Sequence, residues 1–104
     1  MKILTVCAEG NSRSVATRLV INQLGNFDVL SCGAYRNKPE TLVMLSDWAD
    51  LILVAESQMA DVFPEQNKSK INKGFELGPD FWQNPFDQNL HTRVKEELKK
   101  INFV

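Results

Sequence analysis

The most informative stretch of the sequence for the fold is Val6-Cys7-Ala8-Glu9-Gly10-Asn11-Ser12-Arg13-Ser14. Before it, residues 2–6 form a short, apolar and partly β-branched run, which predicts a buried strand. After it, apolar residues recur at helical spacing over 13–24, and Gly25-Asn26 supplies a helix stop. The stretch is therefore predicted to be a loop between a strand and a helix.

The alternation of strand and helix patterns continues along the chain. Apolar runs at 27–31 and 50–55 predict two more buried strands, and 71–77 is compatible with a short fourth one. One helix is expected to begin at Pro39, and a closing helix is expected over 90–101, because apolar residues fall there at helical spacing.

The order of these elements predicts the fold class. A short helix is expected over 57–63, and residues 78–87 are predicted to be a loop because they hold two prolines and further turn residues. Strands that alternate with helices favour parallel βαβ units with right-handed crossovers. We therefore predict an α/β protein, a three-layer sandwich with a central four-stranded parallel sheet, as a single domain over residues 1–104.

Length and composition exclude several classes of function. The chain has 104 residues, 43% hydrophobic and 24% charged, which is typical of one globular domain. A formal net charge of −1 gives no reason to expect nucleic acid or an anionic membrane as a partner. Two cysteines are too few for a disulfide framework, and no apolar run has the length of a signal peptide or a membrane span. We expect a reduced, cytoplasmic protein.

The loop after the first strand carries residues suited to anion chemistry. Ligands of open parallel sheets bind beyond the carboxyl ends of the strands, where Cys7 is predicted to lie. Successive backbone N–H groups and the positive end of the following helix favour an oxyanion there, and Arg13 can bind two of its oxygens. In such a pocket the pKa of Cys7 is expected to fall, and Ser14 can stabilise the resulting thiolate by donating its hydroxyl proton.

The alternative interpretation is a small buried cysteine next to a solvated arginine. Cations are unfavourable in the first turn of a helix, so the position of Arg13 needs a reason. An anion held by the loop supplies that reason, and the functional interpretation is therefore favoured.

The segment Cys7–Ser14 resembles the Cys-x5-Arg-Ser phosphate-binding loop of the low-molecular-weight protein tyrosine phosphatases, which also follows the first strand. Residues 29–33 are similar to the Ser-Ala-Gly turn that follows the second strand in this family. Residues 48–54 are similar to the family's third strand. The chain is shorter than is usual for the family and looks closest to a compact branch of predicted bacterial phosphatases.

The resemblance implies a phosphomonoesterase that acts through a phosphocysteine intermediate on a phosphotyrosyl protein or a small aryl phosphate, with no cofactor and no metal ion. Cys7 would attack phosphorus in line, and Arg13 with the loop would hold the equatorial oxygens. The residues expected to bind phosphate are Ala8, Glu9, Gly10, Asn11, Ser12, Arg13 and Ser14. The family's acid lies before the last helix, which makes Asp80 the candidate and Asp87 the reserve, although Asp87 is also a good helix N-cap.

Three departures from the family pattern affect what the loop is expected to do. Glu9 and Gly10 replace the usual Gly-Asn pair, and a carboxylate at Glu9 would repel phosphate unless it points out of the loop. Ser12 replaces the frequent second cysteine of the loop. The usual Asp-Pro order is inverted to Pro79-Asp80.

Several other residues are candidates for a role near the loop. Cys32 could form a protective disulfide with the loop cysteine, but a buried structural thiol is the favoured interpretation. Tyr35, Phe81 and Trp82 could form the walls of a slot for an aromatic substrate, or could simply belong to the core. His91, the only histidine, has no metal-binding partners in the sequence and is assigned no role.

Three alternative functions stay open at this point. An arsenate reductase on the same fold would pass electrons along further cysteines, and only Cys32 is available. A phosphotransfer module, the IIB component of sugar phosphotransferase systems, has a similar loop but needs neither an arginine nor an acid loop, so Arg13 and Asp80 argue against it. A non-catalytic phosphate-binding protein is the third alternative, and Glu9 is its best support.

Overall fold

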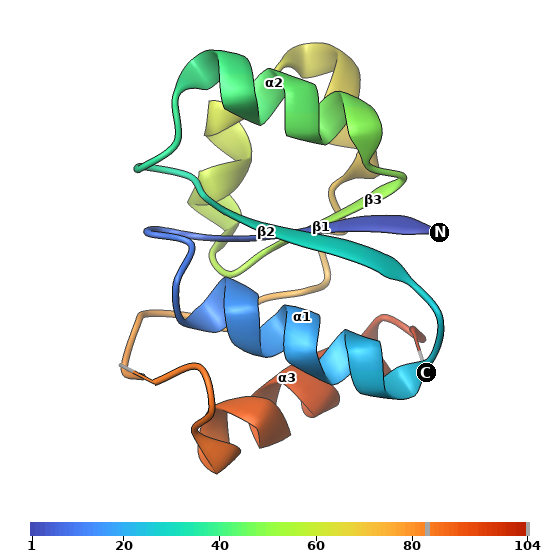
Figure 1. Ribbon diagram of the computed structural model, residues 1–104, viewed down its shortest axis with the longest axis vertical. Helices are drawn as coiled ribbons and strands as arrows, with labels where there is room; N and C mark the ends of the chain where they lie inside the picture. The colour runs from blue at the N-terminus through green and yellow to red at the C-terminus, as the bar shows by residue number, and fades with distance from the viewer. Residues whose placement is uncertain (83, 104) are drawn as a thin grey trace.

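A parallel sheet of three strands forms the centre of the structure (Figure 1). The computed structural model describes residues 1–82 and 84–103. Its strands are β1 (Lys2–Cys7), β2 (Asp28–Gly33) and β3 (Leu51–Val54), in the spatial order β2-β1-β3. The central strand β1 is buried from its second residue to its last, as expected for a parallel strand covered on both faces.

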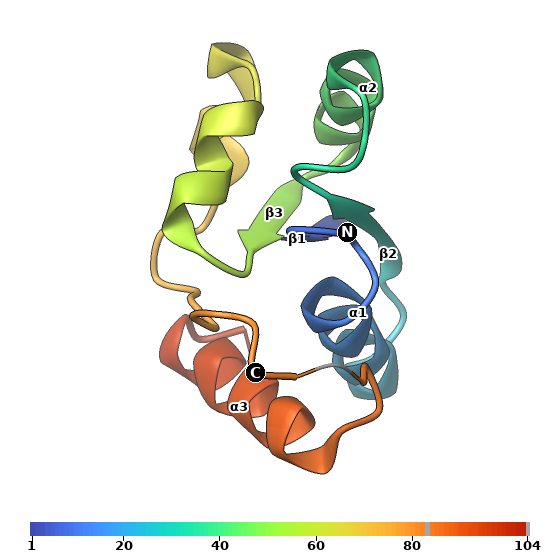
Figure 2. The same ribbon diagram turned by 90° about the vertical axis from the view of Figure 1, so that its left-hand side faces the viewer.

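Helices cover both faces of this sheet (Figure 2). The helices α1 (Arg13–Leu24) and α3 (Gln88–Lys100) lie on one face. The helix α2 (Pro39–Trp48) and two 3-10 helices, η1 (Ser57–Val62) and η2 (Glu65–Lys70), lie on the other. The predicted α/β class and its three layers are therefore confirmed. The largest fully buried aliphatic side chains are Ile3, Leu4, Val6, Val20, Ile21, Ile52, Leu53, Met59, Leu90 and Leu98.

The sheet has three strands, whereas the sequence predicts four. The segment 71–77 makes one isolated bridge to β3, between Ile71 and Ile52, and then leaves the sheet. Asn72 explains the departure, because its side-chain oxygen accepts the N–H of Gly74 at 2.9 Å and thereby closes a local turn. The side chain of Asn72 therefore ends the extended conformation that the sequence pattern predicts for this segment.

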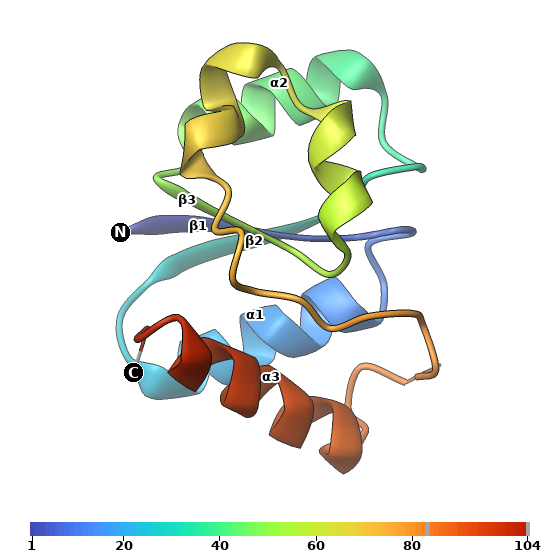
Figure 3. The ribbon, with the colours of Figure 1, turned by 180° about the vertical axis from the view of Figure 1, so that it is seen from behind.

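The segment rejoins the sheet where β3 ends. The N–H groups of Leu77 and Gly78 donate to the carbonyl of Ala55 at 2.8 and 3.1 Å. From there the chain crosses to the other face of the sheet and enters α3, as Figure 3 shows from behind. This path brings residues 78–82 to the edge where all three strands finish. Among the described residues, no helix has both the length and the apolar character that crossing a membrane requires.

Candidate active site

Residues 7–14 curl around the sulfur of Cys7 at the carboxyl end of β1. The N–H of Gly10 donates to Sγ at 3.2 Å, and the hydroxyl oxygen of Ser14 lies 3.1 Å from Sγ. Gly10 has φ +80°, a left-handed conformation that glycine adopts without the penalty of a side chain. The loop therefore encloses Cys7, which is only 1% exposed.

The loop rests directly on the turn after β2. A Cβ atom at Gly10 would lie 2.7 Å from the amide nitrogen of Gly33, and a Cβ atom at Gly33 would lie 2.6 Å from the carbonyl carbon of Glu9. Two backbone hydrogen bonds fasten the same contact, because Ala34 donates to the Cys7 carbonyl at 2.7 Å and Tyr35 to the carbonyl of residue 8 at 3.0 Å. Two backbones thus touch where side chains would normally separate them.

The environment of Cys7 favours its thiolate. Burial by itself raises the pKa of Cys7, but the hydroxyl of Ser14 and the backbone N–H groups of Ser14, Ser12 and Gly10 lower it by more. The net effect is a pKa below the ordinary thiol value of 9.0, in the direction that the sequence predicts. Because the thiolate is the nucleophilic form, this sulfur is suited to attack an electrophilic centre near neutral pH.

Cys32 lies on the neighbouring strand but faces away from Cys7. In the register of the two strands Cys7 is opposite Gly33 and Cys32 is opposite Val6. Successive side chains of a strand point to opposite faces of the sheet, so the two sulfurs lie on different faces. Both thiols are free, and burial, together with the charge of Cys7, raises the pKa of Cys32 to about 12. Cys32 is therefore a buried structural thiol, as the sequence favours.

Arg13 begins α1 and is buried to 1% exposure. Its Nη1 donates to the carbonyl of Gly78 at 2.7 Å and to Oε2 of Glu56 at 3.1 Å. Its Nε is buried and finds no hydrogen-bond partner among the described residues; Oδ1 of Asp80 approaches it only to 3.8 Å. A buried charged donor without an acceptor is costly, and an oxyanion held in the loop would supply that acceptor.

The two candidate acids have different surroundings. Asp80 lies 3.8 Å from the guanidinium of Arg13, and its side chain is 46% exposed, so it stands at the mouth of the loop. Asp87 accepts the N–H groups of Asn89 and Leu90 at 2.8 and 3.3 Å, which makes it the N-cap of α3. The cap that the sequence predicts for Asp87 is confirmed, and of the two candidate acids Asp80 is the one that lies near Arg13.

The remaining residues of the loop divide into exposed and buried ones. Glu9 and Asn11 are exposed, Ala8 and Gly10 are partly exposed, and Ser12 is buried. The exposure of Glu9 is compatible with a carboxylate that points out of the loop, as the sequence analysis requires for a residue that does not repel phosphate.

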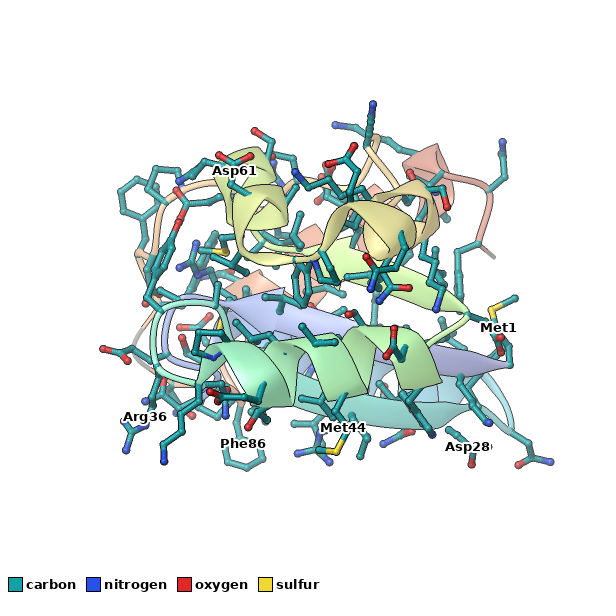
Figure 4. The ribbon with its side chains drawn as sticks, turned by 90° about the horizontal axis from the view of Figure 1, so that it is seen from above. Met1, Asp28, Arg36, Met44, Asp61 and Phe86 are labelled. Carbon is teal, nitrogen blue, oxygen red and sulfur yellow. The ribbon has the colours of Figure 1, made fainter. Side chains whose placement is uncertain are left out.

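Aromatic side chains surround the end of the molecule where the strands finish. Figure 4 shows Phe86 at the lower edge of the view, between Arg36 and Met44 and on the half of the molecule away from Met1. Tyr35 is 60% exposed and Phe81 78% exposed, while Trp82 packs partly against the core with its ring 5.9 Å from that of Phe81. Tyr35 and Phe81 are thus exposed, whereas Trp82 belongs partly to the core, and a slot for an aromatic substrate stays a prediction.

Two of the contacts to Arg13 were not assigned from the sequence. They are the contacts to the carboxylate of Glu56 and to the carbonyl of Gly78, to which the sequence pattern gives no role. A carboxylate one residue beyond a buried strand, at the same edge as a buried arginine, is a signal that could have identified Glu56. His91, which was assigned no role, binds the carbonyl of Pro85 through Nε2 at 2.7 Å and so tethers the segment before α3.

Comparison with known proteins identifies the fold. No protein-family model matches the chain. No curated protein is similar to it in sequence. Among solved structures, the tyrosine phosphatase AmsI of Erwinia amylovora superposes with a TM-score of 0.71 at 18% identity, over 99% of this chain and 92% of that one.

Two further solved structures show the same likeness. The tyrosine phosphatase Wzb of Escherichia coli K30, solved with phosphate, has a TM-score of 0.69 at 14% identity, over 96% of this chain and 94% of that one. The YwlE arginine phosphatase of Geobacillus stearothermophilus has a TM-score of 0.64 at 21% identity, over 98% and 93%. The chain therefore has the fold of the low-molecular-weight tyrosine phosphatases.

Proposed function

We propose that the protein is a phosphomonoesterase that uses Cys7 as its nucleophile, Arg13 as its phosphate-binding cation and Asp80 as its acid and base. The observation that carries this proposal is the pairing of a thiol of lowered pKa with a buried arginine, six residues apart, whose Nε has no acceptor among the described residues. Phosphate esters need both an attacking nucleophile and donors for the charge on the equatorial oxygens.

The reaction has two steps. In the first, Sγ of Cys7 forms a bond to phosphorus while the bond from phosphorus to the ester oxygen breaks. Asp80 gives its proton to that leaving oxygen. In the second step Asp80 takes a proton from water as the water oxygen attacks phosphorus, and the bond between phosphorus and Sγ breaks. Inorganic phosphate and the Cys7 thiolate are the products, so the site returns to its starting state.

The aromatic residues near the entrance of the site support a substrate class. The exposed rings of Tyr35 and Phe81 can contact an aromatic leaving group, which supports a phosphotyrosyl protein or a small aryl phosphate as substrate. Two of the proteins with this fold are named tyrosine phosphatases and one is named an arginine phosphatase, so phosphoarginine is the competing substrate to test. We place this reaction in the cytoplasm, where thiols stay reduced.

The alternative functions have less support. Cys32 faces the other side of the sheet from Cys7 and has a raised pKa, so it is a poor relay for arsenate reduction. A phosphotransfer module would not need a buried Arg13. The support for a non-catalytic binding protein is the carboxylate of Glu9. Glu9 is exposed, so this carboxylate has room to point away from a phosphate in the loop.

The test is hydrolysis of p-nitrophenyl phosphate, a phosphotyrosyl peptide and phosphoarginine from mildly acidic to neutral pH. We expect Cys7→Ser to abolish turnover and Arg13→Ala to lower it by about 10²- to 10³-fold, the usual effect of losing one such donor. Asp80→Asn should slow the phosphotyrosyl peptide more than p-nitrophenyl phosphate, because nitrophenolate leaves without much help from an acid. Asp87→Asn, which keeps the cap, is the matched control and should not affect turnover.

Two results would overturn the proposal. Turnover that survives Cys7→Ser would exclude the phosphocysteine route. Absence of turnover with all three substrates, while tungstate still protects Cys7 from alkylation, would leave an anion-binding or phosphotransfer protein.

A further inference from the structure

The short hydrogen bonds of Arg13 use one side of its guanidinium, and on the other side the carboxylate of Asp80 approaches Nε only to 3.8 Å. Nη1 donates both short hydrogen bonds, to the carbonyl of Gly78 at 2.7 Å and to the carboxylate of Glu56 at 3.1 Å. The Nε atom has no partner among the described residues. Because the guanidinium is planar and rigid, fixing Nη1 also fixes the direction of the edge formed by Nε and Nη2. That edge is the one that can bind two oxygens of one oxyanion.

Glu56 is placed next to Arg13 by the end of β3. The residue before it, Ala55, donates its N–H to the carbonyl of Val6 at 2.8 Å and accepts the N–H of Gly78 at 3.1 Å. Glu56 therefore leaves the sheet beside β1 and beside the second acceptor of Arg13. Its side chain is 20% exposed and that of Arg13 is 2% exposed. Breaking so enclosed an ion pair leaves a poorly solvated charge, so the contact resists rotation of the guanidinium.

Glu76 links the two acceptors of Arg13 to each other. Its carboxylate accepts the N–H of Ser57, the residue after Glu56, at 2.9 Å. Two residues beyond Glu76 is Gly78, whose carbonyl is the other acceptor. Glu76 therefore connects the segment that carries Glu56 with the segment that carries Gly78, and so limits how far the two acceptors of Arg13 can move apart.

Glu76 is in turn held by α3. Its carbonyl accepts a hydrogen bond from Nη2 of Arg93 at 3.0 Å, and its N–H donates to Glu97 at 3.3 Å. Glu97 is buried to 2% exposure and also pairs with Lys100 at 2.9 Å. A buried carboxylate with several donors is a rigid anchor, so the helix that closes the fold supports the Arg13 site from behind.

We propose that Glu56 is a positioning residue for Arg13: its carboxylate and the Gly78 carbonyl hold Nη1, so that the Nε and Nη2 edge faces the phosphate bound by the loop. This inference rests on the proposed phosphatase function and adds a residue to it. Glu56 does not touch the substrate. It acts through the orientation of Arg13, and its removal should weaken oxyanion binding without changing the thiolate.

The experiment compares Glu56→Ala, Glu56→Gln and Arg13→Ala with the natural protein. Glu65→Ala is the matched control, because it removes a carboxylate whose side chain is 90% exposed on η2. Besides kcat/KM for p-nitrophenyl phosphate, two quantities are measured on each variant of the whole chain. The first is the affinity for tungstate, from its protection of Cys7 against alkylation. The second is the rate at which neutral iodoacetamide alkylates Cys7 without any anion, which reports the thiolate alone.

We expect Glu56→Ala to weaken tungstate binding and to lower kcat/KM for p-nitrophenyl phosphate, each by about tenfold or more, since a misoriented guanidinium loses one of its two bonds to the anion. The alkylation rate should stay within about twofold of the natural rate, since no donor to the sulfur is lost. Glu56→Gln keeps an acceptor oxygen for Nη1 and should lose clearly less than the alanine variant. Glu65→Ala should match the natural protein.

The contrary outcomes separate this inference from the proposed function. If Glu56→Ala binds tungstate as tightly as the natural protein, or more tightly, while Arg13→Ala does not bind it, Glu56 does not position Arg13 and the phosphatase proposal stands. If Arg13→Ala also binds tungstate normally, the proposed function itself fails. If alkylation and tungstate affinity fall together in both Glu56 variants, the residue supports the loop as a whole and the positioning role is overturned.

Discussion

At the scale of single residues, Cys7 and Cys32 show how far neighbouring groups decide the chemistry of a thiol. Both are buried on adjacent strands, and burial raises the pKa of each. Among the described residues, hydrogen-bond donors are directed at the sulfur of Cys7 but not at that of Cys32, and they reverse the effect of burial on the pKa of Cys7. The two thiols therefore differ in reactivity because of the loop that surrounds one of them.

This difference predicts selective alkylation. In the native protein at neutral pH, iodoacetamide should label Cys7 and leave Cys32 unlabelled, as peptide mass spectrometry would show. Ser14→Ala should slow the labelling of Cys7 at pH 7 by about tenfold, the effect of one hydrogen bond to a charged group. Ser69→Ala, which removes an exposed hydroxyl on η2, is the control and should not change the rate. Equal labelling of both cysteines in the native protein would contradict the pKa assignment.

At the scale of elements, two glycines with the same backbone conformation have different surroundings. Gly10 has φ +80° and Gly78 has φ +81°, but a Cβ atom would meet the Gly33 nitrogen at 2.7 Å in the first case and nothing within 4 Å in the second. Each alanine variant bears the conformational penalty of about 1–2 kcal/mol, and only Gly10→Ala adds a collision with backbone. We expect Gly10→Ala to abolish tungstate binding and Gly78→Ala to retain it. Retention by both variants would show that the loop can relax.

The N-terminus of α3 allows a prediction about stability that is separate from activity. Asp87→Ala removes the acceptor for two N–H groups and should lower the free energy of unfolding by about 1 kcal/mol. Asp87→Asn keeps a capping oxygen and should lose only a small part of that amount. Urea denaturation measures both, and turnover should be unchanged in each. A loss of turnover without a loss of stability would instead assign Asp87 to the chemistry.

At the scale of the whole molecule, the buried thiol of Cys32 couples folding to alkaline pH. Below pH 9 it is protonated in both the folded and the unfolded chain and contributes no pH dependence. Above its ordinary pKa of 9.0 the unfolded chain loses the proton, while the folded protein keeps it up to about 12. Stability should therefore fall by about 1.4 kcal/mol per pH unit across that window, because the unfolded state binds fewer protons.

The measurement is the free energy of unfolding between pH 9 and 12 for the natural protein, Cys32→Ala and Cys7→Ala. The slope should become shallower from pH 9 onward only in Cys32→Ala. In Cys7→Ala the slope above pH 9 should remain but should end at a lower pH, because the charge of Cys7 is the second cause, after burial, of the raised pKa of Cys32. Cys7 is the matched control because its pKa is shifted in the opposite direction, so that its contribution grows as pH rises toward 9.0 and is then constant. An unchanged slope in Cys32→Ala would mean that the buried thiol ionises without unfolding.

The sequence predicts the local features of this molecule better than the long-range ones. The strand–loop–helix unit around Cys7 and the cap at Asp87 depend on neighbouring residues, and both appear where the patterns predict them. The expected strand over 71–77 failed because the side chain of Asn72 closes a turn, which an apolar pattern does not detect. The contact between Arg13 and Glu56 was missed because it joins residues 43 positions apart.

The contact between Gly10 and Gly33 makes the loop unsuitable as a portable module. A protein engineer who grafts residues 7–14 onto another parallel sheet would also have to transplant the glycine of the neighbouring strand, since a Cβ there meets the Glu9 carbonyl carbon at 2.6 Å. Directed evolution faces the same constraint, because a side chain gained on either partner cannot be accommodated by the other. The unit that can be moved between scaffolds is therefore the loop over 7–14 together with the segment that carries Gly33.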